Sequence, residues 1–361
     1  MSSSIRFSVI GCGFMGEIHA RNIVASEGAE LVCCCDIDLA RAAQLAEETG
    51  AHHSTSDPAA VMSDGAVDTV VIATPHHNHA ELAMAAAECG KHILLEKPMA
   101  MNVEECLAIE QAVDRAGVCL MLGFKFRFAP AVLAAKEAVP HPILVIGQCL
   151  YDADDQASGW AHDPAQSGGP LIGTLVHVVD LIRFVSGSEP VRVYADGCNR
   201  RARVEEPQLS SSDRAAHGEA SPGPVPAEPR LPARAPDNAV ATLTLDNGVI
   251  ASIVLGASAT SGLLSKWCLQ VVGTHANATI YDHVCRMRLH HIGERSDPPD
   301  LVDRMANSHE VGTAALLAEF MAAIRQGRPA SPGPRDGTLS VLICRQLERS
   351  IETGRPEPIT A

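Results

Sequence analysis

The feature that most constrains the fold is a glycine-rich turn between a short apolar run and a helical pattern. Phe7 to Ile10 is apolar and leads directly into Gly11-Cys12-Gly13-Phe14-Met15-Gly16, after which apolar residues recur at helical spacing. Strand, turn and helix in this order is the context in which G-x-G-x-x-G predicts a dinucleotide site. Gly11 permits the turn, Gly13 lets a pyrophosphate approach the backbone, and Gly16 lets helix and strand pack closely. The helix N-terminus adds amide donors for the phosphates.

An acidic residue ends the next apolar run. Leu31 to Cys35 is apolar and is followed by Asp36, twenty residues past Gly16. An acid at this position accepts hydrogen bonds from the adenosine ribose hydroxyls and repels a 2′-phosphate, so we expect NAD to be preferred over NADP. The alternative is that Asp36 or Asp38 only caps the helix predicted from Leu39 to Thr49. Asp38 can do this alone, which leaves Asp36 for the ribose.

Strands and helices continue to alternate as far as Leu122. Apolar or β-branched runs predict the strands, and helical spacing after capping residues predicts the helices. The further strands are Val67–Ala73, Ile93–Leu95 and Val118–Leu122, and the helices start at Asp57-Pro58, at Ala80 and at Asn102-x-x-Glu105, a predicted capping box. This alternation predicts a parallel, doubly wound α/β sheet in a first domain of residues 1–123.

A glutamate and a lysine directly follow one of these strands. Ile93 to Leu95 ends in Glu96-Lys97-Pro98. The carboxyl end of a strand in such a sheet faces the ligand crevice. Pro98 cannot continue a central strand and restricts Lys97 to an extended conformation, so the backbone would hold Lys97 at the crevice. The alternative is a solvated Glu-Lys pair after an edge strand.

Three histidines lie close together in the loop Thr74-Pro75-His76-His77-Asn78-His79. They suggest a metal site, but tetrahedral sites draw ligands from several segments, and no acid or cysteine pair accompanies these histidines. We therefore predict no metal site. A loop at the carboxyl end of a sheet strand is better explained as lining the cofactor crevice.

Charge and cysteine content limit the partners and the compartment. The chain has 361 residues, enough for two domains, and its formal net charge of −15 argues against nucleic-acid or anionic-membrane partners. The twelve cysteines include no C-x-x-C pair, and Cys33 to Cys35 are adjacent in an apolar run, which is typical of reduced, buried thiols. We found neither a signal peptide nor an apolar run near the ~18 residues that span a bilayer. We expect a soluble, cytoplasmic protein.

The pattern changes after Phe124, where period-two alternation and β-branched residues dominate. Strands are predicted at Ile143–Leu150, Val191–Ala195, Val240–Leu245, Val249–Leu255, Trp267–Val272 and Ala278–Tyr281, and helices at Leu171–Val185 and Ala314–Arg325. Asp246-Asn247-Gly248 predicts a hairpin. We expect an α+β domain over residues 124–361, with a largely antiparallel open sheet and helices on one face.

The segment Arg200 to Pro236 does not fit this domain. Seven of its 37 residues are proline. Such a segment cannot bury a core, so we interpret it as a mobile, disordered insertion between strands.

Together these segments resemble the Gfo/Idh/MocA family of NAD(P)-dependent oxidoreductases, such as inositol and sugar dehydrogenases. The matches are the glycine motif, Asp36, Ala73-Thr74-Pro75 with His79, and above all Glu96-Lys97-Pro98. The resemblance implies that these residues line an NAD site and that Lys97 lies beside the nicotinamide and the substrate hydroxyl. The family commonly forms dimers or tetramers through its open sheet, which implies a homodimer or homotetramer here.

The second half carries a matching segment, Gly168 to Asp180, which resembles the family's Gly-Gly-x-Leu-x-Asp-x-Gly-x-His-x-x-Asp. His177 matches the general base, and imidazole titrates near neutral pH. The alternative for a histidine among valines is a core residue. The family's Asp, which usually contacts the substrate, is replaced by Gly173 here. Thr174 could supply a hydroxyl, but one residue along a helix turns a side chain by about 100°.

The resemblance implies an NAD-dependent dehydrogenase acting on a secondary hydroxyl of a sugar or an inositol-like cyclic polyol. Lys97 would bind the reacting hydroxyl and His177 would remove its proton. Further substrate contacts are expected from Arg127, Tyr151, Thr174 and Asp180. The alternative function is a non-catalytic, NAD-binding sugar sensor or regulator of the same fold. Lys97 and His177 argue against this alternative, and Gly173 argues for it.

Overall fold

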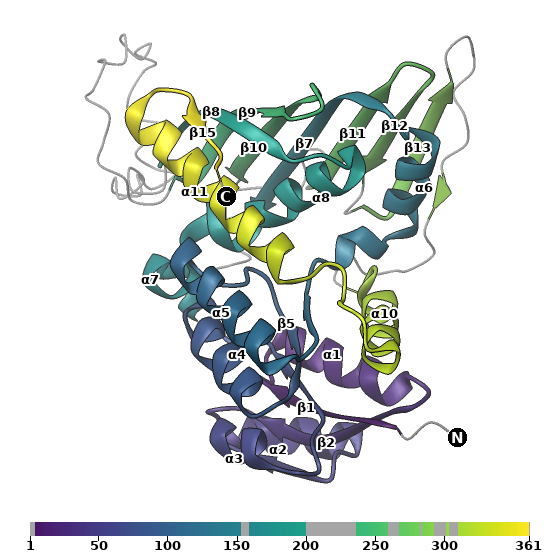
Figure 1. Ribbon diagram of the computed structural model, residues 1–361, viewed down its shortest axis with the longest axis vertical. Helices are drawn as coiled ribbons and strands as arrows, with labels where there is room; N and C mark the ends of the chain where they lie inside the picture. Colours follow the sequence, from purple (N-terminus) through teal and green to yellow (C-terminus); the bar gives the residue numbers. More distant parts are fainter. Residues whose placement is uncertain are drawn as a thin grey trace, which may run out of the picture.

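The computed structural model describes residues 4–152, 159–199, 236–258, 267–281, 284–291, 301–302 and 310–360. These residues form two sheets, one of six strands and one of nine, with helices packed against both (Figure 1). Residues 200–235, nearly all of the predicted insertion, lie outside the described residues.

The first sheet is parallel throughout, with strand order β3-β2-β1-β4-β5-β6. Its strands are β1 (Ile5–Ile10), β2 (Ala29–Cys35), β3 (His53–Thr55), β4 (Thr69–Ile72), β5 (His92–Leu95) and β6 (Leu120–Leu122). The predicted doubly wound α/β sheet is confirmed. Only β3 was not predicted, because its three residues, His-Ser-Thr, carry no apolar signal. Strand order reverses between β1 and β4, where ligands bind in sheets of this kind.

Helices connect these strands and end at the residues that their sequences indicate. They are α1 (Phe14–Ala25), α2 (Leu39–Thr49), α3 (Pro58–Ser63), α4 (His79–Glu88) and α5 (Val103–Ala116). Asp38 caps α2 as predicted by accepting hydrogen bonds from the first-turn amides. The capping box of α5 is only half formed: Asn102 accepts from the Glu105 amide, but the Glu105 carboxylate accepts from the amide of Met101, one residue too early.

The second sheet is antiparallel except for one pair, β7 with β10, and has the order β14-β13-β12-β11-β7-β10-β9-β8-β15. Its strands are β7 (Pro142–Asp152), β8 (Pro190–Cys198), β9 (Asn238–Leu245), β10 (Ile250–Ser258), β11 (Trp267–Gly273), β12 (Ala276–Tyr281), β13 (Arg286–His291), β14 (Leu301–Val302) and β15 (Glu357–Pro358). The hairpin predicted at Asp246-Asn247-Gly248 joins β9 to β10. The sequence reading missed β13, β14 and β15.

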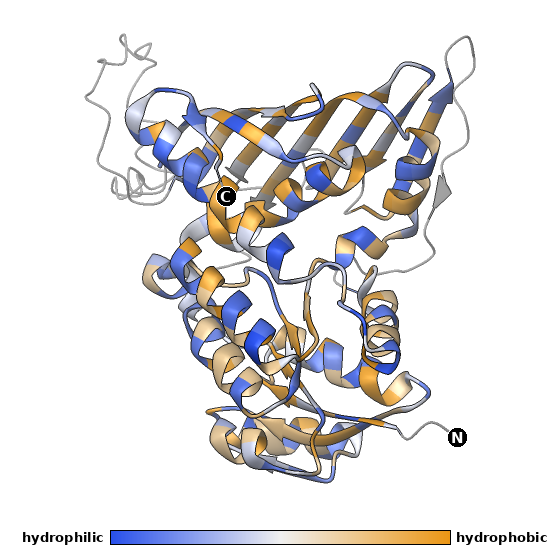
Figure 2. Cartoon of the chain, viewed as in Figure 1, coloured by the Kyte–Doolittle hydropathy of each residue, from blue (hydrophilic) through white to orange (hydrophobic). Residues whose placement is uncertain are grey.

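Three helices pack on one face of this sheet, namely α6 (Pro130–Ala138), α8 (Val176–Ser186) and α11 (Pro334–Thr353) (Figure 1). Apolar and polar residues alternate along its strands (Figure 2). Residues facing the helices, such as Ile253 and Leu243, are buried, whereas Tyr194, Val240 and Ile250 on the opposite face are exposed. The predicted open sheet with helices on one face is therefore confirmed.

A helix from the end of the chain completes the core of the first sheet. Helix α10 (Thr313–Gln326) lies beside α1 (Figure 1). Its Leu317 and Phe320 belong to the same buried cluster as Phe7 of β1 and Ile23 of α1. The polypeptide thus returns to the first sheet after building most of the second.

One helical stretch, Pro164–Ser186, is long and apolar enough to cross a membrane by length and composition, which the sequence reading had not found. Within the protein, 72% of its most apolar window is buried, as expected for a core helix. The twelve cysteines are all free, and Cys33 to Cys35 are buried, as predicted.

Candidate active site

In the glycine-rich turn, Gly11 and Gly16 pack tightly against the rest of the protein, whereas Gly13 faces open space. Gly11 has a φ of +94°, and a Cβ there would lie 2.5 Å from the Ala73 carbonyl oxygen. A Cβ at Gly16 would lie 1.8 Å from the Gly11 carbonyl oxygen, so both positions require glycine. A Cβ at Gly13 would meet no described atom within 4 Å, and no side chain caps the N-terminus of α1. The Gly11 and Cys12 amides are bound within the protein, so it is the N-terminus of α1 that can receive a phosphate.

Asp36 lies at the carboxyl end of β2, beside this turn, and is buried. Its Oδ2 accepts a hydrogen bond from the Cys12 amide at 2.8 Å, and its Oδ1 accepts from the Asp38 amide at 2.9 Å. The Arg41 guanidinium lies 3.4 Å from Oδ1, and its side chain is 52% exposed. Each carboxylate oxygen can accept more than one hydrogen bond, so Asp36 can still bind ribose hydroxyls.

Glu96 follows β5 and is buried in an ionic cluster. Its Oε1 lies 2.8 Å from Nε2 of His19 on α1, and its Oε2 accepts from the Lys97 amide. Burial alone would raise the pKa of Glu96, but His19, Lys97 and Lys125 outweigh it and lower that pKa to about 2. Glu96 is therefore a fixed anion that orients the turn at Lys97, rather than an open ligand contact.

Lys97 reaches across to the second half of the chain. Its Nζ donates a hydrogen bond of 2.9 Å to the carbonyl oxygen of Gly173. Burial lowers the pKa of Lys97, and the Glu96 carboxylate opposes that shift. An ammonium group has three donors, so two remain for a ligand after the bond to Gly173. Lys97 thus binds the backbone about one helical turn before His177.

A second buried lysine, Lys125, was missed in the sequence. It lies in the 3₁₀ turn η2 (Lys125–Phe128), close to Glu96 and Lys97. Burial lowers the pKa of Lys125 to about 8, with Glu96 opposing and Lys97 adding to this shift. The sequence contained a signal for it, because Lys125 follows strand β6 at the same edge of the sheet as Lys97.

The histidine loop after β4 forms the short 3₁₀ turn η1 (His76–Asn78) and does not bring its histidines onto one ligand. His79 is fully buried, with Nδ1 at 2.7 Å from the Pro98 carbonyl oxygen and Nε2 at 3.0 Å from that of Thr74. It ties this loop to the Glu96-Lys97-Pro98 turn. His77 is exposed, and His76 points to a different carbonyl, that of Ser167. Across the described ranges, no group of three or more His, Cys, Asp or Glu could hold a metal ion.

His177 lies in the first turn of α8, directly after a π-helical turn at Leu171–Leu175. Its ring is surrounded by three aromatic rings, with centroids 4.8 Å away for Phe126, 5.7 Å for Trp267 and 6.0 Å for Phe124. Single-turn π-helical segments occur frequently at functional sites. Lys97 approaches this segment at Gly173, and both Gly173 and Thr174 are partly exposed.

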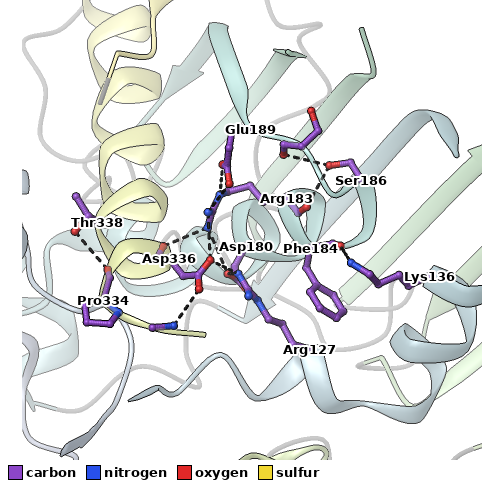
Figure 3. Close-up of polar contacts among 12 residues, drawn as sticks. Arg127, Lys136, Asp180, Arg183, Phe184, Ser186, Glu189, Pro334, Asp336 and Thr338 are labelled. Carbon is purple, nitrogen blue, oxygen red and sulfur yellow. Dashed lines mark hydrogen bonds and ion pairs between the residues drawn. The ribbon is translucent and has the colours of Figure 1, made fainter. Parts of the chain in front are cut away.

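Arg127 and Asp180, which we expected at the substrate, pair with each other (Figure 3). Arg127 Nε donates to Asp180 Oδ2 at 2.9 Å, its Nη2 donates to Oδ1, and Nη2 also donates to Asp336 of α11 at 2.8 Å. Arg183 binds Asp336 and Glu189 beside them. Burial raises the pKa of Asp180, against the opposing effect of Arg127. Asp180 is almost fully buried and binds Arg127 through both carboxylate oxygens, so we propose a positioning role for the pair.

Of the remaining expected residues, Ala73, Thr74 and Pro75 are partly exposed at the carboxyl end of β4, next to Gly11. The backbone of Tyr151 belongs to β7, but its side chain lies outside the described residues.

Comparison with known proteins decides what this arrangement belongs to. Residues 5–124 match the model of an oxidoreductase family with an NAD-binding Rossmann fold, and residues 135–279 match the Gfo/Idh/MocA C-terminal domain. The chain belongs to the Gfo/Idh/MocA family. The predicted family is thus confirmed over both halves of the chain.

Similar members of this family include inositol dehydrogenases. The chain is 36% identical to scyllo-inositol 2-dehydrogenase (NAD(+)) of Bacillus subtilis over 55% of its own length, and 34% identical to inositol 2-dehydrogenase 2 of Saccharopolyspora erythraea over 58%. These matches cover 58% and 61% of the two relatives, less than two thirds of each. The solved structure of a levoglucosan dehydrogenase in complex with NADH is 25% identical, with a TM-score of 0.80 over 99% of this chain and 100% of that one.

Proposed function

We propose that the protein is an NAD-dependent dehydrogenase that moves a hydride between nicotinamide and a secondary hydroxyl or ketone carbon of a sugar or cyclic polyol. One observation carries the proposal. The Lys97 ammonium, at the carboxyl end of β5, donates to the carbonyl of Gly173, one turn before His177. This bond supports a site in which a cation from one segment and a base from another act on the same substrate.

In this proposal, Lys97 binds the reacting oxygen and His177 transfers the proton. Lys97 donates a hydrogen bond to the reacting oxygen and stabilises the negative charge that develops there. His177 takes the hydroxyl proton when the alcohol is oxidised and returns it when the ketone is reduced. Phe124, Phe126 and Trp267 surround the imidazole of His177 and fix its position.

The first half of the chain fits NAD. The open amides at Gly13 and the N-terminus of α1 suit a pyrophosphate, and Asp36 suits a ribose diol. When NAD is bound, its nicotinamide ring accepts or gives the hydride. The family match over residues 5–124 and the NADH complex of the similar levoglucosan dehydrogenase support this choice. The free thiols of all twelve cysteines support a cytoplasmic location.

The experiment measures NADH formation with scyllo-inositol and levoglucosan, which are named for the similar proteins, and with myo-inositol. We expect at least one to be oxidised. His177→Ala should lower kcat by about 10²- to 10⁴-fold, the usual contribution of a positioned base, while the Kd for NADH stays unchanged. Lys97→Ala should lower kcat comparably, because it removes the charge at the reacting oxygen.

The matched control is His53→Ala, which replaces an exposed histidine on β3 and should leave turnover unchanged. A wild-type protein that binds NADH and a polyol without turnover would contradict the proposal and favour the sensor function. Turnover that survives His177→Ala would refute the assignment of the base.

A further inference from the structure

A histidine from another segment packs against Gly173, where the family resemblance led us to expect an aspartate. A Cβ built on Gly173 would lie 3.2 Å from Cε1 of His76 and 3.8 Å from its Nδ1. Position 173 has no backbone conformation that requires glycine, since its φ is not in the left-handed region. Glycine at this position therefore makes room for the imidazole of His76.

The ring of His76 is held in one orientation. Its Nδ1 lies 2.7 Å from the carbonyl oxygen of Ser167, which can only accept, so Nδ1 carries the proton and donates. Trp160 contacts the ring edge-on at a centroid distance of 4.7 Å. Burial lowers the pKa of His76 to about 2, and the neighbouring His79 and Lys97 contribute, so the ring stays neutral.

This tautomer leaves Nε2 of His76 as a hydrogen-bond acceptor. Among the described residues, Nε2 of His76 has no hydrogen-bond partner. Unpaired side-chain polar atoms that are fully buried occur elsewhere in the described residues, but Nε2 of His76 is not one of them. Solvent therefore reaches Nε2. The Cε1–Nδ1 edge of the ring faces Gly173, and the Lys97 ammonium is near enough to disfavour a charge on the ring, so His76 lies among the residues proposed to bind the substrate.

We propose that His76 is a specificity-determining residue whose Nε2 accepts a hydrogen bond from a substrate hydroxyl adjacent to the one that reacts. The inference rests on the proposed dehydrogenase function and names its substrate class, a vicinal diol. A carboxylate at position 173 would be an anionic hydrogen-bond acceptor, whereas the imidazole of His76 is a neutral acceptor. With His76, the positive charge of Lys97 is balanced by Glu96.

The first arm of the test compares the best polyol substrate with its monodeoxy analogues, each lacking one hydroxyl next to the reacting carbon. Wild type should prefer the parent over one analogue by roughly 10- to 100-fold in kcat/KM, the usual effect of losing one buried hydrogen bond. His76→Phe keeps the ring volume and removes the acceptor. It should abolish that preference by lowering kcat/KM for the parent only, with the Kd for NADH unchanged.

The second arm restores the acid. Gly173→Asp alone should lose most activity, because the added carboxylate crowds His76, whose Cε1 would lie 3.2 Å from the new Cβ. His76→Ala combined with Gly173→Asp should recover kcat/KM to within about tenfold of wild type and recover the preference for the parent diol. Because both arms report ratios between substrates, a variant that merely folds less well would lower both substrates equally.

His76→Phe with the same preference as wild type, or with an equal loss for parent and analogue, would overturn the role of His76. Failure of the double variant to regain the preference would overturn the replacement of the acid. Wild type is assayed first, so absence of any turnover refutes the dehydrogenase itself and is distinguishable from these results.

Discussion

Asp36 interacts with three groups that have different effects on cofactor choice. The Cys12 amide ties it to the glycine-rich turn, the Asp38 amide ties it to the start of α2, and the half-exposed Arg41 guanidinium lies 3.4 Å from Oδ1. The carboxylate repels a 2′-phosphate, whereas Arg41 would attract one. The preference for NAD therefore rests on Asp36 acting against a cation already in place.

We predict that wild type binds NAD more tightly than NADP and that Asp36→Ser narrows the ratio of the two Kd values by at least about tenfold. The reason is that the substitution removes the repulsion and leaves Arg41 available to the phosphate. Fluorescence titration with both cofactors measures this. The control is the double variant Asp36→Ser with Arg41→Ala, which should not show the increased affinity for NADP. Equal Kd values for the two cofactors in wild type would refute the role of Asp36.

At the scale of single elements, an ion-pair cluster holds three segments together behind the site. Arg127 belongs to η2, Asp180 and Arg183 to α8, and Asp336 to the start of α11 (Figure 3). The rings of Phe126 and His177 contact each other. Phe126 directly precedes Arg127 in the sequence, and His177 lies one helical turn before Asp180. The cluster therefore fixes the aromatic surroundings of the base through the backbone.

Asp180→Ala should lower the free energy of unfolding by about 3–5 kcal/mol, because it leaves the buried Arg127 guanidinium with one partner fewer. Thermal and urea denaturation measure the loss. Glu17→Ala is the matched control, since it breaks an exposed ion pair with Arg21 and should cost less than about 1 kcal/mol. A stable Asp180→Ala protein with impaired substrate binding would instead support the substrate contact that the sequence suggested.

What the sequence could predict depended on how local its signals were. The caps of α2 and the hairpin at Asn247-Gly248 are local, and both were predicted. Strand β13 reads Arg-Met-Arg-Leu-His-His and has no clear apolar period, so it was missed. The pairing of Arg127 with Asp180 joins residues 53 positions apart, and His76 meets Ser167 across 91 positions. Such partners are set by the tertiary fold alone.

At the scale of the whole molecule, one face of the second sheet carries none of the helices among the described residues. Tyr194, Val240 and Ile250 are exposed there, and the register places Val240 opposite Val254 and Ile250 opposite Leu144. Contiguous apolar residues on an open face are typical of subunit interfaces. We propose that this face joins two copies of the chain.

Light scattering after size exclusion should therefore show a dimer or tetramer for wild type. Val240→Glu should shift the protein toward the monomer, because it places a charge in the apolar interface, while the melting temperature of the monomer changes little. Leu107→Glu on α5 also replaces an exposed apolar residue by an acid; it is the control and should not alter the mass. A monomeric wild type would contradict the interface.

The return of α10 to the first sheet has a consequence for the order of synthesis. Leu317 and Phe320 cover Phe7 and Ile23, which are translated before them. This part of the apolar surface around β1 and α1 stays uncovered until the chain has been made as far as Phe320. The nucleotide-binding half therefore cannot finish folding while the second half is still being translated, and nascent chains stalled between the two halves depend on chaperones to remain unaggregated.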